Sequence, residues 1–124
     1  MNEVVQRLRG SLKTEENRSF QMGRNDGRRW AEDLAEVHHL WTLENLSKKL
    51  PEKKDWEDAL KKHKWNFDWL WWEFDPQFRN HPALKKFEDQ FRMADDDRAI
   101  NLPSYVHGFV EGGLSLWREV KDKL

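Results

Sequence analysis

The chain has 124 residues, with 22 Lys and Arg balancing 23 Asp and Glu, and it contains no cysteine. The balanced charge gives no overall field that would attract nucleic acid or an anionic membrane, and the lack of cysteine excludes disulfides, cysteine-ligated zinc, iron–sulfur clusters and cysteine nucleophiles. Eight Trp and seven Phe supply enough apolar surface for an aromatic core inside a charged shell. We therefore expect one folded, cytoplasmic domain over residues 1–124, with no membrane span.

The first strong element is expected to be a long helix that starts near Thr14. Over residues 1–13, a few apolar residues at helical spacing are interrupted by a Gly-Ser pair, which predicts either a weak helix or a flexible arm. Thr14 is suited to an N-cap position. Apolar residues at helical spacing then continue from Phe20 to about His39, where we expect this helix to end.

Prolines divide the rest of the chain. A second helix is predicted over residues 42–50, and Pro51 both ends it and opens a third. Residues 65–74 include seven apolar residues and could be a buried strand by periodicity alone, but the helical context favours a helix or helix-turn. Pro82 opens a further helix, and a last long helix starts at residue 103 or 104. Because no stretch alternates as a half-buried strand does, we predict a compact all-α bundle of about five helices.

The first and last long helices share one pattern of aromatic, glycine, carboxylate and glycine at identical spacing. Glycine costs about 0.8–1 kcal/mol relative to alanine inside a helix, so four of them require a reason. A helix face without side chains lets two backbones approach closely. We predict that the two helices pack together at these glycines, within one chain or between two. The copies are Phe20-x-x-Gly23-x-x-Asp26-Gly27 and Tyr105-x-x-Gly108-x-x-Glu111-Gly112.

Two residue pairs have the spacing of metal ligands on a helix. Glu36-x-x-His39 is the ligating unit of ferritin-like carboxylate bundles, and His107 and Glu111 lie four residues apart in the last helix. A site built from both pairs would support a metal-dependent or acid/base enzyme, which is our second hypothesis. The chain has no second Glu-x-x-His unit. We therefore expect no resident cofactor, and a divalent metal only where the two pairs meet.

The aromatic residues of the 65–74 segment are the candidates for a binding surface. On a helix, aromatics this close together spread around the circumference, so that not all can face one core. These aromatics are either part of the core or, in part, an exposed interaction patch. The second alternative is plausible because Trp is enriched in binding hot spots and a large exposed apolar patch marks a partner site. The four residues are Trp69, Trp71, Trp72 and Phe74.

Our first hypothesis is a non-enzymatic protein–protein interaction module of the inhibitor, immunity or accessory-subunit type, whose partner is another protein or a second copy of this chain. A third hypothesis is a nucleic-acid-associated protein that uses the arginines of the first thirty residues. Carboxylates interrupt that basic stretch, which argues against the third hypothesis.

Overall fold

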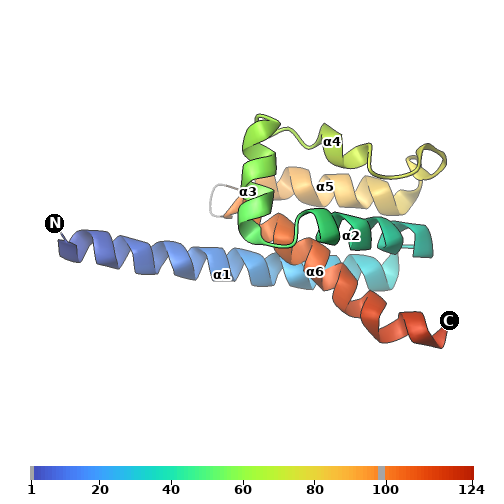
Figure 1. Cartoon of the computed structure of the whole chain (residues 1–124), viewed down its shortest axis with the longest axis horizontal. Helices are drawn as coiled ribbons and strands as arrows, with labels where there is room; N and C mark the ends of the chain where they lie inside the picture. The colour runs from blue at the N-terminus through green and yellow to red at the C-terminus, as the bar shows by residue number, and fades with distance from the viewer. Residues whose placement is uncertain (1, 98–99) are drawn as a thin grey trace.

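The computed structural model describes residues 2–97 and 100–124, apart from the side chain of residue 78. All regular structure in this part of the chain is helical, which confirms the predicted all-α bundle. Figure 1 shows two long helices, α1 and α6, with the shorter helices packed on one side of them. The elements are α1 (Asn2–Asp33), α2 (Val37–Lys49), α3 (Lys53–Lys62), α4 (Asp68–Trp71), α5 (Pro82–Asp96) and α6 (Leu102–Val120), with short 3-10 helices η1 (Pro76–Phe78) and η2 (Lys121–Lys123). Across the described ranges, no helix has the length and apolar character needed to cross a membrane.

The contact between α1 and α6 is made by the four predicted glycines, and both helices belong to the same chain. A Cβ added at Gly23, Gly27, Gly108 or Gly112 would lie closer than 3.0 Å to a backbone atom of the opposite helix. Each helix thus presents a Gly-x-x-x-Gly face to the other, and the two backbones are in direct contact. The prediction that the first and last long helices pack together is confirmed.

The crossing has a local two-fold pseudosymmetry. Gly23 faces the carbonyl of Tyr105, and Gly108 faces the carbonyl of Phe20, which is the residue equivalent to Tyr105 in the other copy of the pattern. The pairing of Gly27 with the Phe109 carbonyl is mirrored in the same way by Gly112 and the Arg24 carbonyl, so that the two helices run parallel. The repeated pattern is therefore also a repeated contact.

Polar side chains tie the same two helices together at the edges of the crossing. The Tyr105 hydroxyl donates to the Asp26 carboxylate at 2.7 Å. The Ser19 hydroxyl, fully buried, accepts from the backbone N–H of Asn101 at 2.8 Å. The guanidinium of Arg28 donates to the carboxylate of Glu119 with both terminal nitrogens, at 3.0 and 2.8 Å. These contacts span most of the chain's length and lock the register of α6 on α1.

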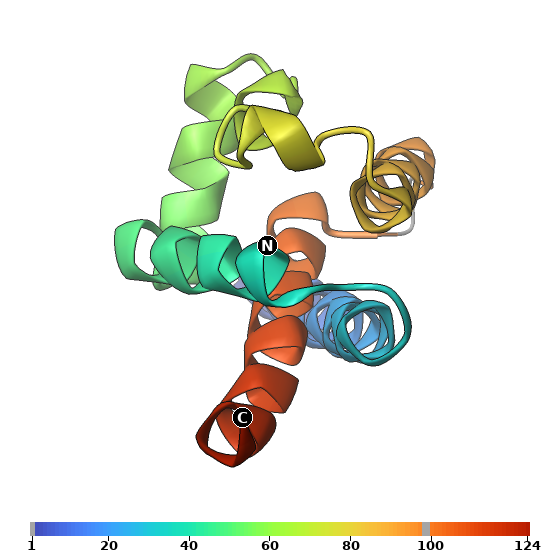
Figure 2. The ribbon, with the colours of Figure 1, turned by 90° about the vertical axis from the view of Figure 1, so that its right-hand side faces the viewer.

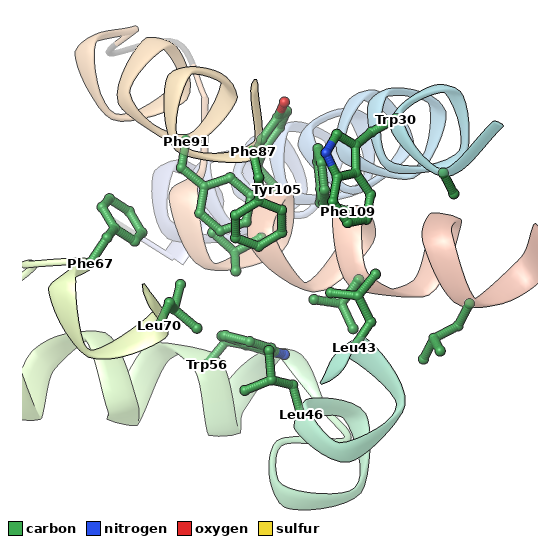
Figure 3. Packing of buried hydrophobic residues seen from close by; sticks show 14 of the residues in the cluster. Trp30, Leu43, Leu46, Trp56, Phe67, Leu70, Phe87, Phe91, Tyr105 and Phe109 are labelled. Atoms are coloured by element: carbon green, nitrogen blue, oxygen red, sulfur yellow. The ribbon is translucent and has the colours of Figure 1, made fainter. Parts of the chain in front are cut away.

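Aromatic rings fill the space between this helix pair and the shorter helices (Figure 3). Phe87 and Phe91 of α5 lie 4.4 Å apart between ring centres, and Phe109 of α6 is edge-on to both. Trp30 of α1 joins them at 5.4 Å from Phe87 and donates its indole N–H to the carbonyl of Ala83 at 2.7 Å. The expected aromatic core is present, and it uses rings from both long helices and from α5.

Several predicted helix boundaries are wrong. Helix α1 starts at Asn2 rather than near Thr14, whose hydroxyl donates to the carbonyl of Gly10 inside the helix at 3.0 Å. It ends at Asp33 rather than near residue 39, because Glu36 leaves the helix to cap α2, which starts five residues earlier than predicted. The 65–74 segment contains one helical turn, α4, as the prediction of a helix or helix-turn expected, and the described residues hold six α-helices, in line with the predicted bundle of about five.

Residues 2–14, for which the sequence left open a weak helix or a flexible arm, are helical and continuous with α1. All thirteen are exposed, and Figure 1 shows this part of α1 extending past the other helices. Its larger apolar side chains form a stripe along one side of the helix, because their spacing of three to four residues keeps them on one face. They are Val4, Val5, Leu8 and Leu12, between 39% and 56% exposed. We call residues 2–14 the α1 arm.

Candidate functional site

An open groove of about 750 Å³ lies between α2 and the chain that follows α4. Figure 2 looks onto this end of the molecule, where α2 runs below the α4 segment. One wall comes from residues 37–45 of α2 and the other from residues 72–77. The α2 wall consists of Val37, His38, Trp41, Thr42 and Asn45.

Two large aromatic side chains, one from each wall, are exposed in this groove. Trp41 is 57% and Trp72 is 72% exposed. Trp41 follows the buried Leu40 directly in α2, and a step of about 100° per residue turns it away from the core. Trp72 caps the single turn of α4, and the guanidinium of Arg79 lies 4.4 Å from its ring centre in a cation–π contact. Exposed indoles of this size are typical of binding surfaces.

Behind the groove, the Glu36 carboxylate joins the N-termini of α2 and α5. One oxygen contacts Nε2 of His81 at 2.6 Å, and the other lies 3.4 Å from Nε2 of His38, which also lines the groove. Nδ1 of His81 accepts from the backbone N–H of Ala83 at 3.0 Å, so the proton of the neutral ring sits on Nε2, facing Glu36. The side chain of His39 accepts from the backbone N–H of Glu36 at 3.0 Å. The cluster therefore fixes the first turns of both helices.

These contacts shift two pKa values. The hydrogen bond from His81, aided by its partial charge and those of the α2 histidines, lowers the pKa of Glu36 against a smaller opposing effect of burial. Burial, followed by the charges of His38 and His81, lowers the pKa of His39 to about 4, although Glu36 acts in the opposite direction. The His39 ring is fully buried and neutral near pH 7, as its role as a hydrogen-bond acceptor requires.

The four candidate metal ligands are not brought together. Glu36 and His39 meet as a helix cap, whereas His107 packs on the ring of Phe20 at 5.2 Å and Glu111 pairs with an arginine of its own helix at 3.7 Å. Among the described residues, no group of three or more His, Asp or Glu is placed to hold a metal ion. The Glu-x-x-His spacing that suggested metal ligation thus has a local cause, the capping of α2.

The aromatic residues of the 65–74 segment divide between core and surface. Phe74 is 2% exposed and belongs to the core. Trp71 is half-buried and packs edge-on against Phe87 at 5.6 Å, while Trp69 is half-buried and stacks on His63 at 4.8 Å. Of the four candidates, Trp72 alone is fully on the surface.

Of the basic residues in the first thirty, two are neutralised locally. Arg18 pairs with Glu15 at 2.6 Å, and Arg28 pairs with Glu32 at 2.9 Å as well as with Glu119. These pairs engage two of the seven basic residues of this stretch, and the nucleic-acid hypothesis stays a prediction.

Two residues of this site escaped prediction from the sequence. Trp41 was overlooked, although its position out of phase with Leu40 and Leu43 marks it as turned from the core. His81 was overlooked too, although Pro82 at the first position of a helix marks the residue before it as the N-cap. His81 and Glu36 are 45 positions apart in the sequence, so no local sequence pattern could have predicted their contact.

The chain matches no known family model, and no curated protein and no solved structure is significantly similar to it.

Proposed function

We propose that this chain is a non-enzymatic protein-interaction module that holds a segment of a partner protein in the groove between α2 and residues 72–77. The observation that carries the proposal is the pair of exposed indoles, Trp41 and Trp72, on facing walls of one groove. Most exposed apolar residues of a small protein are scattered singly, whereas two tryptophans around one hollow form a patch of the kind that partners cover.

The polar groups of the groove favour binding over catalysis. Thr42, the hydroxyl in the α2 wall, donates to the carbonyl of His38 at 3.0 Å and is thereby used within the helix. No cysteine is present to act as a nucleophile. Of the two carboxylates in the lining, Glu73 pairs with Lys49 at 3.0 Å, and Asp75 accepts from the backbone N–H of Gln77 at 3.1 Å. Behind the groove, the Glu36 carboxylate is held by two histidines that position helix ends, which is a structural use of the charge.

The proposal is tested by selecting peptides of about twelve residues that bind the purified protein, and then measuring their affinity for three variants. Trp41→Ala and Trp72→Ala each remove one aromatic anchor. Met93→Ala is the matched control, because Met93 is 65% exposed on α5 and lies outside the groove lining. Truncation of a hot-spot residue costs about 2 kcal/mol or more, so we expect at least 30-fold weaker binding for each tryptophan variant and no change for the control.

Peptides that bind both the Trp41→Ala and the Trp72→Ala variant as tightly as the wild type would place the binding surface elsewhere. Failure to select any peptide above background would refute the groove as a site for protein segments.

A further inference from the structure

The groove carries two carboxylates as well as its two indoles. They belong to Glu73 and Asp75. Two cations contact the lining from outside it: Lys49 pairs with Glu73 at 3.0 Å, and the Arg79 guanidinium lies over the Trp72 ring. Asp75 is exposed. Together with Trp41 and Trp72, these carboxylates suit a segment that carries apolar side chains flanked by cations.

This chain contains a segment of that chemistry, the α1 arm. Its stripe of Val4, Val5, Leu8 and Leu12 is exposed. The cations beside the stripe are Arg7, Arg9 and Lys13, against the single carboxylate of Glu3. Most helix stability in proteins comes from packing of an apolar face, so this exposed end of α1 gains little from the fold. The arm is thus an amphipathic helix whose apolar side lacks a partner among the described residues of its own chain.

The arm cannot reach the groove of its own molecule. A rise of about 1.5 Å per residue places Leu8 roughly 37 Å from Asp33, the end of α1. Helix α2, which forms one wall of the groove, starts after a connection of three residues from that end. Figure 1 shows the arm and the start of α2 at opposite ends of the molecule.

We infer that the groove of one copy binds the α1 arm of a second copy, so that the protein associates head to tail. The inference rests on the proposed function of the groove and names its occupant. The arm lies with Val4, Leu8 and Leu12 towards the indoles, and its cations face the groove carboxylates. Such a contact joins two different surfaces, so each bound molecule still offers a free arm and a free groove, and the assembly extends into short chains.

A symmetric pairing of two arms is the competing arrangement, and the charges oppose it. Two arms side by side bring six cations together against two carboxylates from Glu3, whereas the groove supplies carboxylates opposite the cations. Electrostatic complementarity of this kind also makes association depend on salt.

The test uses sedimentation velocity on the full chain over a concentration series. The arm variant is Leu8→Asp, the groove variant is Trp72→Ala, and Met93→Ala is the control; all three positions are exposed, so that the fold is preserved, as circular dichroism will verify. We expect dimers and longer chains for the wild type and the control, with weaker association at high salt. Each site variant alone should remain monomeric, with association at least 30-fold weaker.

Mixing the two site variants decides between the arrangements. The arm variant keeps an intact groove and the groove variant keeps an intact arm, so the mixture should form a one-to-one dimer that cannot extend. A groove variant that still dimerises by itself, or a mixture that stays monomeric, would overturn the head-to-tail contact. A wild type that is monomeric at all concentrations would also overturn it, while peptide selection at the groove would separately decide the proposed function.

A third variant tests whether the arm binds as a helix. Gly10 lies inside the arm, and a Cβ added there meets nothing within 4 Å. Gly10→Ala favours the helical arm and should tighten association by up to about fivefold, since the substitution is worth close to 1 kcal/mol of helix propensity. Weaker association of this variant would contradict a helical occupant.

Discussion

The contact between α1 and α6 makes a sharp prediction for Gly27→Ala. The added methyl group would lie closer than 3.0 Å to the oxygen, carbonyl carbon and Cα of Phe109, all of which are backbone atoms of α6. A side chain could rotate away, but a helix backbone moves only as a unit. The two helices must therefore separate, and the matching contacts at the other three glycines are weakened at the same time.

The size of the effect follows from two opposing contributions. Overpacking typically costs 1–3 kcal/mol, and a clash with an immobile backbone places this one near 3 kcal/mol. Alanine in place of a helical glycine stabilises the fold by roughly 1 kcal/mol, through its higher helix propensity and the lower entropy of the unfolded chain. We therefore expect the free energy of unfolding to fall by about 2 kcal/mol and Tm to fall by about 8 °C for a domain of this size.

The assay is urea unfolding followed by circular dichroism, with Gly113→Ala as the matched control. A Cβ at Gly113 meets the end of the Leu43 side chain, which can shift, and lies 3.7 Å from the nearest backbone atom of α1. This variant should cost less than 1 kcal/mol. The pseudosymmetry adds a second expectation, since Gly112→Ala faces the Arg24 carbonyl as Gly27→Ala faces that of Phe109 and should cost the same to within about 0.5 kcal/mol.

The double variant examines the mechanism. Once the first methyl group has pushed the helices apart, the second meets less resistance, so Gly27→Ala with Gly112→Ala should cost less than the sum of the single variants. A Gly27→Ala protein as stable as the wild type would refute the close backbone contact. Full additivity would refute the shared separation of the helices.

Three further predictions concern other parts of the fold. His39 has a folded pKa of about 4 against an ordinary 6.5, so the unfolded chain binds a proton that the fold excludes. The contribution of neutral His39 to the free energy of unfolding is therefore complete above pH 6.5 and is lost as the pH falls towards 4, by about 3 kcal/mol in all and about 2 kcal/mol by pH 5. The variant His39→Asn keeps an acceptor that does not titrate, so its urea midpoints should change less between pH 7.5 and 5 than those of the wild type. Tyr105→Phe removes the donor to the half-buried Asp26 and should cost about 1–2 kcal/mol in urea unfolding, whereas an unchanged midpoint would show the hydrogen bond to be dispensable. Trp72→Ala should alter stability by less than about 0.5 kcal/mol, while Trp71→Ala, which opens the core beside α5, should cost about 3 kcal/mol; equal costs in thermal melts would contradict their assigned exposures.

The helical class and the contact of the long helices could be predicted because each depends on a local pattern. A glycine in a helix is costly, and four at matched spacing in two helices have few explanations other than a close crossing. The helix boundaries could not be predicted in the same way. Thr14 has the chemistry of a cap but lies inside α1, and Glu36 caps α2 with the help of a histidine, a combination that cap preferences rank low.

The groove could not be predicted from the sequence, because its two walls come from segments that are far apart along the chain. Its walls are two stretches about 30 residues apart, and the angle between them depends on where α4 ends and on how His81 holds the start of α5. The exposure of Trp72 follows from α4 having one turn only, whereas a longer helix would have placed the aromatic residues differently. Position relative to the core, not residue type, separates Trp72 from Trp71.

The same separation means that stability and binding can be measured independently in this protein. The core contains buried rings from α1, α3, α5 and α6 and from residues 67–74, and neither Trp41 nor Trp72 belongs to it. Each indole leaves a large apolar area in water, and that area becomes a source of free energy when a partner covers it. Substitutions at these two positions should therefore change affinity with little change in the free energy of unfolding, while substitutions at the glycine crossing should do the reverse. A variant of either class that changed both quantities together would show that the groove and the crossing are coupled.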